Sequence, residues 1–112
     1  MAGETDLGEM LATLEVVRRP GVFTYITSET VGVGQAAAMI REDEGTTLVV
    51  STEVATEHGY AIEFEAAWLT LVVHSSLEAV GLTAAFSAAL GARGIACNVL
   101  AGHVHDHILV PL

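Results

Sequence analysis

The spacing of apolar and polar positions predicts that the chain begins with a helix followed by a strand. Four apolar residues recur at helical spacing, namely Leu7, Met10, Leu11 and Leu14, and Asp6 with Glu9 has the form of a capping box. This pattern predicts a helix over residues 5–18, which Pro20 and Gly21 would end. The following "VFTYITS" at 22–28 is rich in β-branched and aromatic residues and predicts a strand.

The same kind of pattern predicts alternating elements up to the middle of the chain. In order, it predicts a loop at 29–35, a helix at 35–44, a strand at 46–51 and a short helix at 52–58. Gly45 and Gly59 each directly follow a predicted helix, where the access of glycine to positive φ favours a helix end. Residues 60–67 are expected to form an extended arm.

The second part of the chain has the clearest pattern. It predicts a strand at 68–74, a helix from Ser75 to Gly94, a strand at 95–102, a turn, and a strand at 107–112. Ser75 and Glu78 fit a capping box, and Gly94 can supply a left-handed helix end. The order strand, helix, strand, strand predicts a split β-α-β unit, in which the last strand lies between the two that flank the helix.

The length of the chain, 112 residues, suits one compact unit or two very small ones that share a core. The first part has a similar order of elements to the second, although their sequences are only weakly alike. We therefore expect a structural duplication, with one half at residues 1–67 and the other at 68–112.

The composition limits the partners and the location that we expect. The formal net charge is −10, from 14 acidic and four basic residues, so neither nucleic acid nor a membrane surface is an expected partner. No apolar run reaches the length of a bilayer span, and the acidic N-terminus lacks the hydrophobic region of a secretory signal. Cys97 is the only cysteine, so no disulfide can form within the chain and a cytoplasmic location is expected.

Several segments of the sequence resemble the ACT-domain superfamily, and in particular small bacterial proteins with two tandem ACT-like halves. They are "HSSLEAVG", "GIACNVLAG" and "HDH" before an apolar strand in the second half, and "LATLEVVRRPGVFTYIT" and "EDEGTTLVV" in the first. The resemblance implies an α+β, ferredoxin-like fold, a split β-α-β antiparallel sheet with helices packed on it. It also implies a regulatory or sensor module that binds an amino acid or similar small molecule and is not an enzyme.

One departure from the ACT pattern affects the expected assembly. An ACT fold needs a second helix after the strand "ILVPL", whereas this chain ends at Leu112. We therefore expect that an apolar strand face is partly exposed, or that a second copy covers it. The high hydrophobic content, 52% of residues, agrees with a homo-oligomer in which a partner covers apolar surface.

The resemblance implies that the loop between strand and helix forms one wall of the ligand pocket, at His74, Ser75 and Ser76. Free backbone N–H groups at a helix N-terminus favour a carboxylate, which every amino acid carries. Capping of the helix is the preferred interpretation for Ser75, because its capping box is complete. For Ser76 both capping and ligand binding are open.

Three further residues complete the predicted ligand site. Gly81, which follows Val80 inside the predicted helix, costs about 1 kcal/mol relative to alanine. Either a ligand passes close to the backbone there, or the helix packs closely on the sheet. Asn98 is unusual in a predicted strand and could bind a ligand or a second subunit.

The cluster "HVHDH" at 103–107 offers an alternative, because histidine and aspartate are metal ligands. We prefer hydrogen bonding in a turn. His103 and His105 are expected in or beside that turn, so the alternation of a strand does not place them on one face with His107. No catalytic set and no cofactor motif stands out. Three hypotheses remain: an amino-acid sensor, a structural or partner-binding subunit, and a metal protein or small enzyme that uses this cluster with His74.

Overall fold

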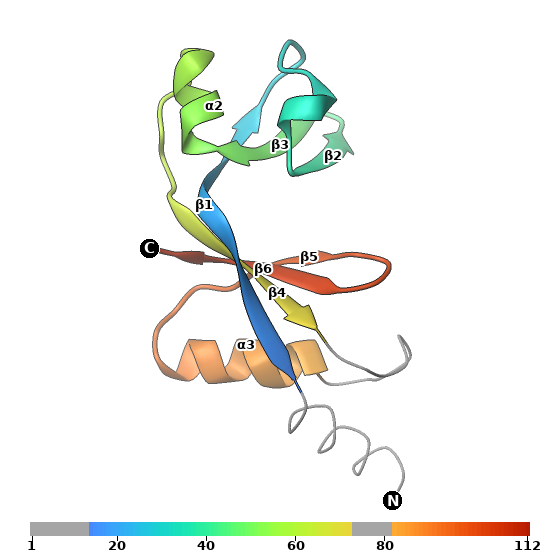
Figure 1. Ribbon diagram of the computed structural model, residues 1–112, viewed down its shortest axis with the longest axis vertical. Coiled ribbons are helices and arrows are strands. Elements are labelled where there is room, and N and C mark those ends of the chain that lie inside the picture. The colour runs from blue at the N-terminus through green and yellow to red at the C-terminus, as the bar shows by residue number, and fades with distance from the viewer. Residues whose placement is uncertain (1–13, 73–81) are drawn as a thin grey trace, which may run out of the picture. The chain divides into compact units, whose positions relative to one another are not determined.

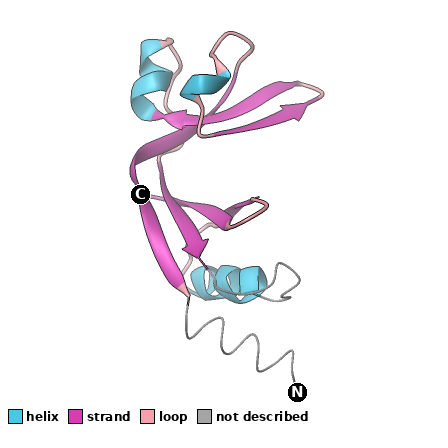
Figure 2. Ribbon diagram, turned by 45° about the vertical axis from the view of Figure 1, so that its right-hand side comes forward, coloured by secondary structure: helices cyan, strands magenta, loops and turns pink. Residues whose placement is uncertain are grey.

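The computed structural model describes residues 14–72 and 82–112, which form a mostly antiparallel sheet with few helices (Figures 1 and 2). The elements are β1 (Glu15–Thr27), the 3-10 helix η1 (Val33–Gln35), β2 (Ala38–Glu42), β3 (Gly45–Ser51), α2 (Thr52–Glu57), β4 (Ala66–Val72), α3 (Leu82–Ala92), β5 (Asn98–Ala101) and β6 (Asp106–Pro111). None of the helices in these two ranges combines the length and apolar character that crossing a bilayer requires.

The chain divides into two compact units. One contains Pro20–Ala67 with Pro111–Leu112, and we name it the 20–67 unit. The other contains the start of β1 up to Arg19 and the described residues from Trp68 to Val110, and we name it the 68–110 unit. Both β1 and β4 contribute residues to each unit.

In the 20–67 unit the strand order is β2-β3-β1, and both pairs are antiparallel. The side chains of Ile26, Leu48 and Val50 are buried together with Val31 and with Ala55 of α2. Ser51 caps α2, because its side-chain oxygen accepts a hydrogen bond from the backbone N–H of Val54. The short helix predicted at 52–58 is thereby confirmed, as are the strands predicted at 22–28 and 46–51.

The helix predicted at 35–44 is wrong, because this segment forms η1 and the edge strand β2. Ala38 pairs with Val49 and Glu42 with Gly45, so that Asp43 and Glu44 form a two-residue turn between β2 and β3. The alanine-rich sequence favours a helix locally. Pairing with the strongly β-forming β3 overrides that preference.

The helix predicted over residues 5–18 is wrong for Glu15–Arg18, which belong to β1, and residues 5–13 lie outside the described ranges. Pro20 and Gly21 do not end the element, since β1 continues through both to Thr27. Gly21 has φ +105°, a conformation that glycine adopts readily and that keeps the strand continuous.

In the 68–110 unit the strand order is β1-β4-β6-β5. β6 lies between β4 and β5, as predicted for a split β-α-β unit. The predicted helix end is also confirmed: α3 stops at Ala92, and Gly94 has φ +71°. The predicted capping box at Ser75 lies outside the described residues. β5 is shorter than the strand predicted at 95–102.

The strand order is the same in the two halves of the sequence. In β1-β3-β2 and in β4-β6-β5, the third strand along the chain lies between the first two. The connection after the first strand differs: it contains η1 in one case and α3 in the other. Among the apolar strand residues of the second half, Val99 is 40% exposed, whereas Leu71 and Ile108 are fully buried.

Candidate functional site

The predicted ligand pocket surrounds the connection from β4 to α3. Five of its residues lie outside the described ranges, namely His74, Ser75, Ser76, Val80 and Gly81. The described structure fixes the two ends of the connection, since β4 ends at Val72 and α3 begins at Leu82. A ligand-binding role for these five residues remains a prediction.

The sixth predicted residue, Asn98, is the first residue of β5, an edge strand of the 68–110 unit. Its side chain is exposed, and Nδ2 donates a hydrogen bond of 3.3 Å to the backbone oxygen of Leu109 in β6. A side-chain amide has a second N–H and a carbonyl oxygen for further bonds. The amide is thus bonded to β6, and the binding of a ligand or a second subunit by Asn98 stays a prediction.

The register of β5 and β6 shows which side chains share a face with Asn98. Asn98 is paired with Leu109 and Leu100 with His107. Paired residues of adjacent strands, and every second residue along one strand, lie on the same face of a sheet. Asn98 and His107 are therefore on one face, two residues apart along the ladder.

On this face His107 belongs to a polar and aromatic cluster that sequence reasoning missed, and we name Arg19, Trp68, Thr70 and His107 the Trp68 cluster. Nε1 of Trp68 donates to Oγ1 of Thr70 and to Nδ1 of His107, at 3.3 Å in each case. Oγ1 of Thr70 lies 2.9 Å from the same Nδ1. Three strands meet here, since Arg19 comes from β1, Trp68 and Thr70 from β4, and His107 from β6.

The Trp68 ring also contacts a second ring and a cation, His107 at a tilt of 55° and Arg19. The ring centroids of Trp68 and His107 are 5.3 Å apart, and Cζ of Arg19 lies 5.1 Å from the centroid of Trp68. This distance suits a cation–π interaction. Trp68 is only 4% exposed, so the indole N–H depends on partners within the protein.

The environment of His107 favours its neutral form. Burial lowers its pKa first, and the charges of His105 and Arg19 lower it further, while Asp106 acts in the opposite direction. An indole N–H can only donate, so Nδ1 of His107 acts as the acceptor and the ring proton is on Nε2. The geometry and the direction of the pKa shift therefore agree.

The histidines of "HVHDH" do not act as one group. The backbone N–H of Gly102 donates to the oxygen of His105 at 3.0 Å, which places His103 and His105 in the predicted turn. Nδ1 of His105 is buried and has no hydrogen-bond partner in the described part of the chain. Across residues 14–72 and 82–112, no three His, Cys, Asp or Glu side chains are close enough to hold a metal ion.

The loop after β1 corresponds to the predicted pocket loop after β4, because β1 and β4 have the same place in the strand orders β1-β3-β2 and β4-β6-β5. Oγ of Ser28 accepts hydrogen bonds of 3.1 Å from the N–H groups of both Thr30 and Val31. A serine at the end of the first strand thus binds backbone N–H groups in the first half. These bonds close a turn, because no helix begins directly after Ser28, whereas the role preferred for Ser75 is that of a helix cap.

Comparison with known protein families gives two matches to this chain. One ACT-domain family model matches residues 2–67, and a second ACT-domain family model matches residues 63–112. The chain belongs to the ACT-domain family. ACT domains as a class are regulatory, non-catalytic modules that bind small molecules and often form oligomers.

A crystal structure supports the same architecture. A protein of unknown function from Vibrio cholerae, described as a possible transport protein, is 37% identical to this chain and superimposes with a TM-score of 0.85. The similarity covers 97% of this chain and 87% of the Vibrio cholerae chain. No curated protein matches the sequence.

Proposed function

We propose that this protein is a regulatory sensor that reversibly binds a small molecule, most plausibly an amino acid. The ligand would bind in the ACT-like half at residues 68–112, a ferredoxin-like unit, between the connection after β4 and the edge at Asn98. The observation that carries the proposal is the ACT-domain match over both halves, together with a strand order that puts β6 between β4 and β5.

The chemistry of this region suits an amino acid. A helix N-terminus offers free N–H groups to a carboxylate, and the Asn98 amide can bind an amino or carboxyl group. The strongly acidic chain favours a ligand that also carries a positive charge. Binding would change the relative stability of two assembly states, which is how a sensor of this kind transmits a signal.

A thermal-shift screen against the twenty amino acids tests the proposal. A ligand at one hundred times its dissociation constant should stabilise the folded protein by about 2.7 kcal/mol. Ser76→Ala and Asn98→Ala should weaken the shift, whereas Thr56→Ala, at an exposed position of α2, should leave it unchanged. A complete screen without any shift would count against the sensor.

A structural or partner-binding homo-oligomer is the second candidate, and exposed apolar side chains at two edges favour it. β2 exposes Met39 and Ile40 by 43% and 44%, and β5 exposes Val99 by 40%. Unpaired strand edges readily pair with another chain. Sedimentation analysis would show a stable oligomer whose mass does not respond to amino acids, whereas a monomer would exclude this alternative.

A further inference from the structure

In the Trp68 cluster, one ring nitrogen of His107 contacts two side chains of β4. The indole N–H of Trp68 donates to Nδ1 of His107, and Oγ1 of Thr70 lies 2.9 Å from the same nitrogen. The contacts link β4 to β6 across 39 and 37 positions of the sequence. β6 in turn holds β5, since Asn98 bonds to Leu109 of β6.

Protonation of His107 would change this arrangement selectively. An imidazolium carries a hydrogen on both ring nitrogens and accepts no hydrogen bond. The hydroxyl of Thr70 can rotate and accept from Nδ1, but the indole of Trp68 has only a hydrogen to offer. The bond between Trp68 and His107 must therefore break when the ring becomes charged.

The charged groups around His107 act against its protonation on balance. Arg19 comes from β1 and His105 from the preceding turn, and a positive charge on either repels an imidazolium. Asp106, the neighbour in sequence, attracts it. The other facing residues, Trp68 and Thr70 of β4 and Leu100 of β5, carry no charge.

We propose that the bond between Trp68 and His107 is a pH-sensitive latch, which is closed when His107 is neutral and open when His107 is protonated. Thr70 lies within hydrogen-bond distance of both side chains, so it keeps its contacts to Trp68 and His107 in either state. The latch therefore changes the environment of the buried indole without separating β4 from β6, which are neighbours in the sheet. The latch does not depend on the proposed function.

The fluorescence of Trp68 tests the latch directly, because it is the only tryptophan of the chain. Between about pH 8 and pH 5 we expect a single fluorescence transition, with a midpoint below the value of 6.5 that an unperturbed histidine shows. The transition should disappear in His107→Gln and remain in His103→Gln and His74→Gln. A flat titration, or one that persists in His107→Gln, would overturn the proposal.

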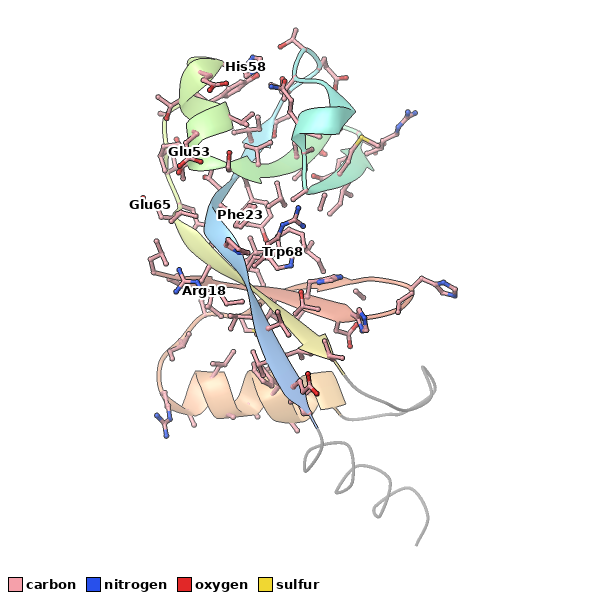
Figure 3. The ribbon with its side chains drawn as sticks, in the orientation of Figure 1. Arg18, Phe23, Glu53, His58, Glu65 and Trp68 are labelled. Carbon is pink, nitrogen blue, oxygen red and sulfur yellow. The ribbon has the colours of Figure 1, made fainter. Side chains whose placement is uncertain are left out.

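Arginine variants separate the latch from a purely structural role. Arg19→Gln removes a positive charge that faces His107 and should raise the midpoint of the fluorescence transition. Arg18→Gln is the matched control, because neighbouring strand residues point to opposite faces and Arg18 extends away from Trp68 (Figure 3). Equal midpoints in the two variants would contradict the latch.

Nitrogen NMR of the unmodified protein keeps the test decisive if His107→Gln fails to fold. At pH 8 the spectrum should show His107 with its proton on Nε2 and an unprotonated Nδ1. A proton on Nδ1 at that pH would refute the latch and leave the proposed function untouched. Conversely, a failed amino-acid screen would refute the sensor and leave the latch standing.

Discussion

At the scale of single residues, two buried hydroxyls in the 20–67 unit have opposite effects on stability. Thr24 is 1% exposed and its Oγ1 has no hydrogen-bond partner in the described structure, whereas Oγ of Ser28, 6% exposed, accepts two backbone N–H groups. Burying a hydroxyl without a hydrogen-bond partner costs desolvation free energy, whereas a hydrogen bond within the protein offsets that cost.

Thr24→Val should therefore stabilise the protein. Valine has nearly the same shape, fills the same space beside Val50, and removes the unsatisfied oxygen. We expect the free energy of unfolding to rise by about 1 kcal/mol in urea denaturation. A loss of more than about 1 kcal/mol would mean that the hydroxyl has a partner, such as a buried water.

Ser28→Ala should have the opposite effect and serves as the comparison. It leaves the N–H groups of Thr30 and Val31 without their acceptor, which should cost about 1–2 kcal/mol in the same measurement. If both substitutions changed stability in the same direction, the hydrogen-bond argument would be wrong.

At the scale of elements, the turn between β2 and β3 depends on one glycine. Gly45 has φ +141°, and a Cβ there would lie 2.9 Å from Cγ2 of Thr27. Gly45→Ala should therefore cost about 1–3 kcal/mol of unfolding free energy. Gly32→Ala is the matched control, since nothing lies within 4 Å of its Cβ position, and it should be neutral or slightly stabilising.

The capping of α2 can be tested in the same way. Ser51→Ala removes the acceptor for the N–H of Val54 and should cost about 1 kcal/mol, whereas Ser51→Asn keeps an acceptor and should be close to wild type. Equal unfolding midpoints for the two variants would show that Ser51 does not act as a cap.

At the scale of the whole molecule, two groups give stability a predictable dependence on pH. Burial lowers the pKa of His107 below 6.5, so the unfolded chain takes up the proton first and stability is lost as pH falls through the folded pKa. Burial raises the pKa of Tyr25 above 10.0, so stability is lost as pH rises through that folded pKa.

Unfolding in urea across the pH range should therefore give a plateau between these two limits. His107→Gln should flatten the decline on the acid side, and Tyr25→Phe should flatten it on the alkaline side while keeping the stacking with Phe64 at 5.9 Å. A decline that is unchanged in the corresponding variant would remove that group from the explanation.

The candidate site was only partly accessible to sequence reasoning. Asn98 is noticeable because asparagine is unfavourable in a strand, and the structure places it at a sheet edge. The Trp68 cluster gave no such signal. Thr70 and Trp68 meet His107 only because β6 inserts next to β4, and no local pattern encodes a contact across 37 or 39 positions.

The sequence by itself determined those features that depend on neighbouring residues. β-branched runs and glycine helix ends were sufficient to predict β3, α2 and the end of α3, because propensity and capping act within a few residues. Only the tertiary structure decided that residues 38–42 and 15–18 are strands, because hydrogen bonding to adjacent strands outweighs their local helical preference. It also decided which side chains meet on the sheet, because strand order and register are properties of the whole fold.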